Sequence, residues 1–286
     1  MLVAAIAVGG IVTALAGRWP VIEAPRAAPA TVAEEIRAHP SLWRHLRRHY
    51  DPRTQTGIAL TVASAVVVVG AVGVGVLLAT VHRNVGIARW DGALAHFGAD
   101  HATAWATRVL HAVSFCLGGT VGMVVLGMVA LAVEMRRRPE RVVPVFLVVI
   151  IGGQAVVCNV IKWFVDRARP DVLPLSDPFG SSFPSGHTTA AAASMAAFAL
   201  LLGRGRSRRV KTVLAGVAAG IATAVAASRV FLGVHWLTDV LAGLALGWSW
   251  FALCSIAFGG RLLRFGLPAE TAALPARPPD SIPTDS

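Results

Sequence analysis

Six long stretches without Lys, Arg, Asp or Glu dominate this 286-residue sequence and restrict the folds that it can adopt. A helix needs about 20 mostly apolar residues to cross the hydrocarbon core of a bilayer. Five of the stretches meet that length, and flanking residues can extend the short one at 212–228. The stretches occupy residues 57–81, 109–133, 142–161, 183–203, 212–228 and 240–260. The chain is therefore predicted to be an all-α polytopic membrane protein, a helical bundle with six core spans.

A seventh apolar stretch, residues 1–17, lacks the basic start and the clear small-residue cleavage site of a secretory signal. Although it is short for a span, it is interpreted as an extra N-terminal transmembrane helix. Residues 18–56 are predicted to form a cytoplasmic linker, in which the basic segment 41–50 can lie as a helix on anionic headgroups. Residues 57–260 form the predicted six-span domain, and residues 261–286 a cytoplasmic, mostly disordered tail.

The connection 82–108 is rich in Ala, and helical spacing places Leu94, Phe97 and Trp105 roughly on one side of it. This pattern predicts a helix that lies at the membrane interface.

The formal net charge of +11 is interpreted as a sign of topology rather than of nucleic-acid binding, because Lys and Arg mark the cytoplasmic loops of membrane proteins. If the linker 18–56, the loops 134–141 and 203–211 and the tail share one side, that side holds 19 of the 26 basic residues. This side is predicted to be the cytoplasmic face of the cell (inner) membrane. The opposite ends of the spans are then extracytoplasmic.

Three polar segments fall at these extracytoplasmic ends: KWFVDRARP at 162–170, PSGH at 184–187 and SRVFLGVHWLTD at 228–239. Polar and charged groups at membrane depth are costly, so their convergence on one level favours a functional site. The candidate site residues are Lys162, Arg169, Ser185, Gly186, His187, Arg229, His235 and Asp239.

The PSGH segment opens an apolar helix, and a helix N-terminus exposes unpaired N–H groups and a partial positive charge that suit an anion. Gly186 allows an anion to approach the backbone closely, and Ser185 adds a hydroxyl donor. Three cations on nearby helix ends, Lys162, Arg169 and Arg229, complete a predicted cradle for a dianionic phosphate.

His235 and Asp239 lie four residues apart and share a face if the last helix has begun by that point. Asp239 is predicted to accept a hydrogen bond from one ring nitrogen of His235, which leaves the other nitrogen as a nucleophile toward phosphorus. His187 is predicted to protonate the leaving oxygen and then to activate water.

These three segments resemble the signature of the type 2 phosphatidic acid phosphatase superfamily, also called lipid phosphate phosphatases: K-x6-RP, PSGH and SR-x5-H-x3-D. All three match in order and spacing, and the resemblance covers roughly residues 57–258. It implies an integral membrane phosphatase that works through a phosphohistidine without a metal or another cofactor, and the composition, with 24 Arg and 2 Lys and abundant Ala and Val, suggests a bacterial source. It also implies catalytic roles for His235, His187 and Asp239, and phosphate contacts from Lys162, Arg169, Ser185, Gly186 and Arg229.

The expected partner is a membrane lipid phosphate or diphosphate; a polyprenyl diphosphate, phosphatidic acid and phosphatidylglycerol phosphate all fit. A phosphotransferase that passes the phosphoryl group to another lipid or a sugar would use the same site. A transporter or lipid-binding protein that only holds an anion is an alternative from another class, and it predicts binding without turnover. The sequence leaves the oligomeric state open.

Two further groups of acidic residues and histidines lie near the extracytoplasmic ends, and neither has a strong metal-ligand motif. They are His96, His101, Asp91 and Asp100, and Asp166, Asp171 and Asp177. The first group is predicted to be solvated. The second flanks the three cations, which argues against Mg²⁺, and Asp166 is expected to pair with the neighbouring Arg167.

Overall fold

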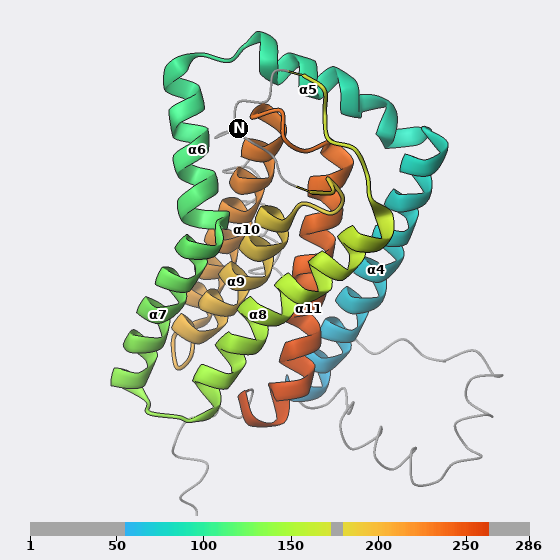
Figure 1. Ribbon diagram of the computed structural model, residues 1–286. Coiled ribbons are helices and arrows are strands. Elements are labelled where there is room, and N and C mark those ends of the chain that lie inside the picture. The colour runs from blue at the N-terminus through green and yellow to red at the C-terminus, as the bar shows by residue number, and fades with distance from the viewer. Residues whose placement is uncertain (1–54, 173–179, 263–286) are drawn as a thin grey trace, which may run out of the picture.

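The computed structural model describes residues 55–172 and 180–262, and within these ranges all regular structure is helical, which confirms the all-α prediction. Figure 1 shows long helices side by side in a bundle, with a short helix, α5, across one end. In chain order the elements are α4 (Gln55–Arg83), the 3-10 helix η1 (Gly86–Arg89), α5 (Trp90–Asp100), α6 (Ala104–Gly118), α7 (Thr120–Arg137), α8 (Val142–Val165), α9 (Gly186–Leu202), α10 (Arg208–Phe231) and α11 (Leu237–Leu262).

Four of the described helices, α4, α8, α10 and α11, are each long and apolar enough to cross a membrane. The bent pair α6 and α7 qualifies together as a fifth span, whereas α9 is a shorter apolar helix of 17 residues. The stretch 212–228 is extended by its flanks into the 24-residue helix α10, as predicted. The protein is therefore a multi-pass membrane protein, and the count of six core spans stays a prediction.

The predicted span at 109–133 is not one straight helix, because α6 and α7 meet at an angle of 51°. The chain leaves helical geometry at Gly119, whose backbone is extended. A Cβ added at Gly118 would lie 2.6 Å from Val225 Cγ1 and 3.1 Å from the carbonyl oxygen of His187. The break therefore falls where α6 packs closely against α10 and the start of α9.

The connection 82–108 also differs from the prediction of one interfacial helix. It turns between α5 and α6, and the side chain of Thr103 accepts a hydrogen bond at the start of α6. Trp105 consequently lies on a different helix from Leu94 and Phe97. Leu94 packs against an apolar cluster of α10 and α11, whereas Phe97 and Trp105 are exposed.

Helix α9 lies at the centre of the bundle, and eleven of its 17 residues are buried. Small residues let its neighbours approach closely. A Cβ at Gly243 of α11 would lie 2.8 Å from the carbonyl oxygen of Ser185, and one at Gly247 would lie 2.6 Å from that of Thr189. This packing places the N-terminus of α9 directly against the first turns of α11.

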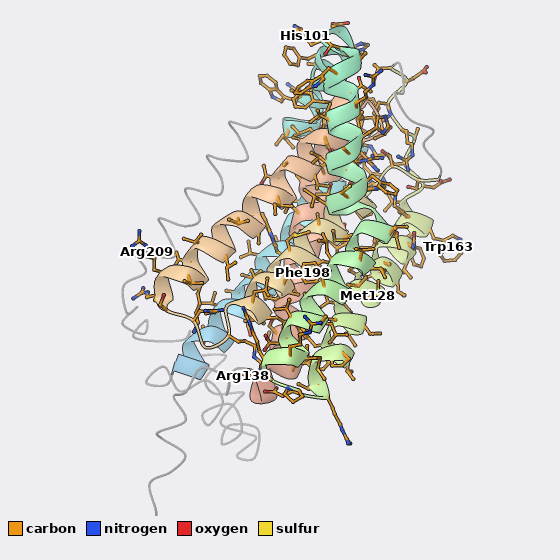
Figure 2. All side chains as sticks on the ribbon, turned by 90° about the vertical axis from the view of Figure 1, so that its left-hand side faces the viewer. His101, Met128, Arg138, Trp163, Phe198 and Arg209 are labelled. Carbon is orange, nitrogen blue, oxygen red and sulfur yellow. The ribbon has the colours of Figure 1, made fainter. Side chains whose placement is uncertain are left out.

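Arg204 joins two of the predicted cytoplasmic loops at the end of the bundle away from α5. Its guanidinium pairs with Glu134 and Glu140, each at 2.8 Å. Figure 2 shows His101 near one end of the bundle and Arg138 near the other. Loops 134–141 and 203–211 therefore share one end, as the charge count supposed. The predicted helix 1–17, the linker up to residue 54, Asp177 and the tail from residue 263 lie outside the described residues.

Candidate active site

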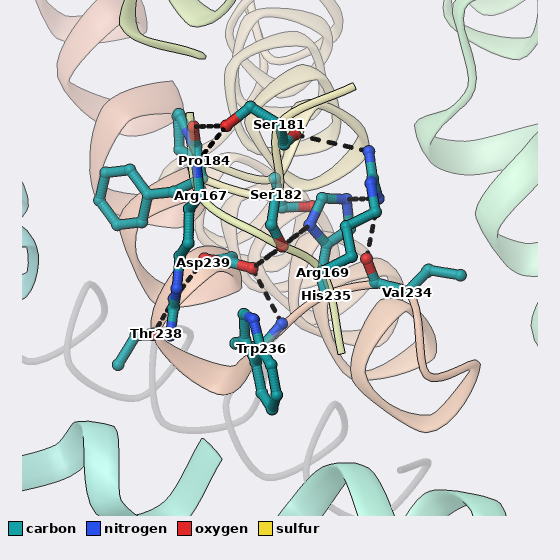
Figure 3. A network of polar contacts seen from close by, with 12 residues as sticks. Arg167, Arg169, Ser181, Ser182, Pro184, Val234, His235, Trp236, Thr238 and Asp239 are labelled. Carbon is teal, nitrogen blue, oxygen red and sulfur yellow. Dashed lines mark hydrogen bonds and ion pairs between the residues drawn. The ribbon is translucent and has the colours of Figure 1, made fainter. Parts of the chain in front are cut away.

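The three polar segments meet at the α5 end of the bundle, and Figure 3 labels residues from each of them. Each predicted site residue lies at or next to a helix end. Lys162 lies in the last turn of α8, and Arg169 follows that helix. Ser185 is the N-cap of α9, and Arg229 lies in the last turn of α10. Asp239 lies in the first turn of α11, with His235 just before it.

The N-terminus of α9 is held within the site. The backbone N–H of Ser185 donates to the carbonyl oxygen of Asp239 at 3.0 Å, and the buried Ser185 hydroxyl accepts from Thr188 at 3.0 Å. No side chain among the described residues caps this helix. Its first N–H groups therefore keep the capacity to bind an anion.

Few protein atoms surround the position where a side chain at Gly186 would lie. Apart from its chain neighbours and the backbone of its own helix, the only described heavy atom within 4 Å of a Cβ built there is Cys158 Sγ, at 3.8 Å, which is an ordinary contact. Protein packing therefore does not require glycine at this position, which fits the prediction that the space is needed by a ligand.

The three predicted cations come from the ends of two helices, Lys162 and Arg169 from the end of α8 and Arg229 from the end of α10. Lys162 Nζ donates to the carbonyl oxygen of Ser181, and Arg169 donates to the carbonyl oxygens of Gly180 and Val234 at 2.9 and 2.8 Å. Arg229 is buried and donates to Ser114 Oγ of α6 at 2.8 Å. Within the described residues its Nε finds no hydrogen-bond partner. A buried unpaired donor beside other cations is suited to an anionic oxygen.

His235 and Asp239 lie side by side, as predicted. Asp239 Oδ2 is 3.5 Å from His235 Nδ1, at the long limit for a hydrogen bond. The other ring nitrogen, Nε2, lies 3.4 Å from a guanidinium nitrogen of Arg169. The geometry therefore directs Nε2 toward the cations. His187 lies within electrostatic reach of His235 and of all three cations.

Burial is the main influence on the protonation of His235. It lowers the pKa of this histidine to about 4; Asp239 opposes the shift, whereas Arg169 and Arg229 add to it. The imidazole is consequently neutral at pH 7, with a lone pair on one nitrogen. A neutral ring is what a nucleophilic role requires.

The sequence interpretation missed two side chains that hold Asp239. Ser182 Oγ donates to Asp239 Oδ2 and lies 3.5 Å from His235 Nδ1. Arg167 donates to Asp239 Oδ1 at 2.6 Å and to Asp91 Oδ2 at 2.8 Å. The only sequence signal for them is their position, because each lies within three residues of a predicted site residue or its motif.

Two of the predictions for acidic residues were wrong. Arg167 pairs with Asp91 and Asp239 rather than with Asp166, because Asp166 ends α8 in a left-handed conformation and is exposed. Asp91 is buried instead of solvated. Asp100, like His96 and His101, is exposed as expected. Among the described residues, no three His, Cys, Asp or Glu side chains are grouped to hold a metal.

The chain is similar to known proteins over much of the described helical core. The profile of the PAP2 superfamily matches residues 143–262. Phosphatidylglycerophosphatase B of Bacillus subtilis is 36% identical over 124 residues, which is 42% of this chain and 59% of that protein. Lipid A 1-phosphatase of Rhizobium johnstonii is 38% identical over 38% of this chain and 43% of its own length. The matched regions thus span about half of these two relatives.

Two further relatives align over more of their length. Decaprenylphosphoryl-5-phosphoribose phosphatase of Mycobacterium tuberculosis is 34% identical over 55% of this chain and 81% of that protein. The crystal structure of a transmembrane PAP2-type phosphatidylglycerolphosphate phosphatase from Bacillus subtilis is 29% identical, with a TM-score of 0.62 over 70% of this chain and 98% of its own. From the three matched segments, the shared fold and these identities, we conclude that the chain belongs to the PAP2 superfamily.

Proposed function

We propose that this protein is an integral membrane phosphatase that hydrolyses a lipid phosphate or diphosphate. The observation that carries the proposal is the buried His235, which has a carboxylate on its Nδ1 side and a guanidinium on its Nε2 side. A phosphate bound between the α9 N-terminus and the cations would meet Nε2. The PAP2 relatives named above are phosphatases of lipid or polyprenyl phosphates, which supports the same reaction class.

The reaction is proposed to pass through a phosphohistidine. His235 Nε2 attacks phosphorus while the bond from phosphorus to the leaving oxygen breaks, and His187 supplies a proton to that oxygen. His187 then takes a proton from water, the water oxygen attacks phosphorus, and the P–N bond breaks to release inorganic phosphate. Lys162, Arg169 and Arg229 stabilise the charge on the transferring group, so we propose that the reaction needs no metal.

The proposed substrate presents its phosphate near the headgroup level while its tail stays in the bilayer. A polyprenyl diphosphate, phosphatidic acid and phosphatidylglycerol phosphate all meet this requirement. The site lies at the end of the bundle opposite the basic loops joined by Arg204. By the positive-inside rule, we propose that it faces the extracytoplasmic side of the cell membrane.

The proposal is tested by phosphate release from purified protein in mixed micelles, with a panel of lipid phosphates and diphosphates, with and without EDTA. We expect release from at least one substrate in EDTA and none from His235→Ala. Reaction in ¹⁸O-labelled water should place one heavy oxygen in each phosphate released. Binding without release across the panel would contradict the proposal, and transfer of phosphate to a lipid or sugar without ¹⁸O uptake would indicate a phosphotransferase.

A further inference from the structure

Arg167 lies at a variable position within the first signature segment, yet its guanidinium contacts Asp239, Thr238 and Asp91. One terminal nitrogen, Nη1, donates to Asp239 Oδ1 at 2.6 Å and to Thr238 Oγ1 at 2.7 Å. The other, Nη2, donates to Asp91 Oδ2 at 2.8 Å. Both terminal nitrogens are thus committed to protein acceptors, in contrast to the unpaired Nε of Arg229. This pattern fits a group that holds other side chains rather than phosphate.

The Asp239 carboxylate depends on this arginine for one of its two oxygens. Oδ2 accepts from Ser182 Oγ and, at 2.9 Å, from the backbone N–H of Trp236, and it also faces His235. Oδ1 accepts from Arg167. The side chain of Asp239 is fully buried, so an unpaired Oδ1 would be costly, and the carboxylate would be free to rotate away from the imidazole.

Asp91 brings helix α5 into the same network. Its Oδ1 accepts from the backbone N–H of Thr238 at 2.9 Å, and its Oδ2 accepts from Thr238 Oγ1 at 2.7 Å. A carboxylate from α5 thus binds the first turn of α11, where N–H groups lack partners within the helix. The same oxygen, Oδ2, receives the Arg167 guanidinium.

The segment that contains Arg167 is held in place by contacts with Trp236 and Ser181. The indole N–H of Trp236 donates to the carbonyl oxygen of Ala168 at 2.9 Å, and the guanidinium carbon of Arg167 lies 5.4 Å from the centre of the Trp236 ring. The backbone N–H of Arg167 donates to Ser181 Oγ at 3.0 Å. These contacts hold the arginine beside the start of α11, where Figure 3 shows it next to Thr238 and Asp239.

We propose that Arg167 and Asp91 are positioning residues for the phosphatase reaction: Arg167 holds the Asp239 carboxylate against His235, and Asp91 ties both to helix α5. This inference rests on the proposed catalytic roles of His235 and Asp239. It assigns α5 a role in forming the active site, although no residue of this helix belongs to the signature. Loss of either side chain lets Asp239 and the imidazole drift from the geometry of attack.

The test compares Arg167→Gln, Arg167→Lys and Asp91→Asn with two matched controls, Arg89→Gln and Asp100→Asn, which change exposed residues of η1 and α5. A misplaced reacting group typically costs up to about 10²-fold in rate. We therefore expect kcat to fall about 10- to 100-fold in Arg167→Gln and Asp91→Asn, with KM changed less than about threefold. Arg167→Lys should recover only part of kcat, because one ammonium cannot bridge two carboxylates as a guanidinium does. The controls should match the unmodified protein.

The pH dependence of kcat/KM distinguishes a positioning role from a purely structural one, because only the positioning role affects the protonation of His235. His235 faces Asp239 of α11, Arg169, Arg229 of α10 and His187 of α9, and Arg167 acts on it only through Asp239. Arg167→Gln frees the carboxylate to move away from the imidazole, so the hydrogen bond and the negative charge of Asp239, which raise the pKa of His235, act on it less and this pKa falls. The acidic limb of kcat/KM, which reports the free enzyme, should therefore move to lower pH in Arg167→Gln.

The double variant Arg167→Gln/Asp91→Asn should lose about as much kcat as Arg167→Gln alone, because both residues act through one contact. Unchanged kcat in both single variants would overturn the inference. A loss of kcat together with a lowered Tm and an unchanged acidic limb of the pH profile would also overturn it. The same holds for variants in which KM rises while kcat stays unchanged. The variant His235→Ala distinguishes failure of the proposed mechanism from failure of the positioning role. If His235→Ala keeps activity, the proposed mechanism is wrong. If His235→Ala is inactive and Arg167→Gln has normal activity, only the positioning role is wrong.

Discussion

At the scale of single residues, Arg229 combines two properties that suit the transition state of phosphoryl transfer. It is buried, and its Nε lacks a partner among the described residues, while Nη1 is fixed by Ser114 of α6. The side chain is therefore oriented before substrate arrives. Preorganised donors of this kind stabilise developing charge without reorganising during the reaction.

Replacing Arg229 should therefore slow the reaction strongly. Loss of one such donor typically reduces the rate by about 10²–10³-fold, so we expect this loss of kcat in Arg229→Ala. Arg229→Lys should recover only part of it, because a lysine cannot bind Ser114 and a phosphate oxygen in the same fork geometry. Steady-state phosphate release from the purified variants measures both effects. Turnover of Arg229→Ala close to that of the unmodified protein would remove Arg229 from the site.

The limits of sequence interpretation also become visible at this scale. His187, His235 and the three cations could be predicted because each has its own chemistry and lies at a span end. Arg167 and Asp91 could not, because their roles depend on a buried contact between residues far apart in the chain. In the sequence alone, Asp91 resembles any carboxylate of an interfacial segment, and Arg167 has an acidic neighbour that offers a simpler partner.

At the scale of helices, hydrophobic length predicted where the spans lie but not how they bend. Apolar content is continuous through 109–133, and a glycine pair within such a stretch usually serves close packing. The break at Gly119 lies next to Gly118, which packs closely against Val225 and the first turn of α9, and such long-range contacts cannot be read from a local pattern. Likewise, the turn before Thr103 places Trp105 on a different helix from Leu94 and Phe97.

Two glycines near the start of α9 differ in what surrounds them, and this difference yields a matched test. A Cβ at Gly118 would overlap Val225 Cγ1 and crowd the carbonyl oxygen of His187, whereas a Cβ at Gly186 meets only Cys158 at 3.8 Å. Overpacking a buried site typically costs about 1–3 kcal/mol. We expect Gly118→Ala to lower the Tm in detergent and Gly186→Ala to leave it unchanged.

The activities of the same two variants should separate packing from ligand binding. If an anion approaches the backbone at Gly186, the added methyl group should reduce kcat/KM by at least about tenfold in a protein of normal stability. Thermal unfolding and phosphate release, measured on the same preparations, make the comparison. Normal kcat/KM in Gly186→Ala would mean that substrate does not approach this part of α9.

At the scale of the whole molecule, the account predicts which end faces the cytoplasm. Asp100 of α5 and Ser207 at the start of α10 are both exposed and belong to opposite sides of the predicted topology. In intact cells, a cysteine at Asp100 should react with a membrane-impermeant thiol reagent, and a cysteine at Ser207 should not. The parent protein, with its three cysteines, controls for background labelling. The reverse pattern would place the site on the cytoplasmic side.

The central claim is that His235 accepts the phosphoryl group from a lipid, and it is tested most directly by trapping that intermediate. The measurement is rapid-quench analysis with a ³²P-labelled diphosphate lipid, whose leaving phosphate departs readily without help from an acid. His187→Ala should form an acid-labile, base-stable phosphoenzyme and then stall, because the second step needs His187 to activate water. His235→Ala should form none, and peptide mapping should place the label on His235. A burst from His235→Ala with none from His187→Ala would contradict the account, because it would assign the nucleophile to the other histidine.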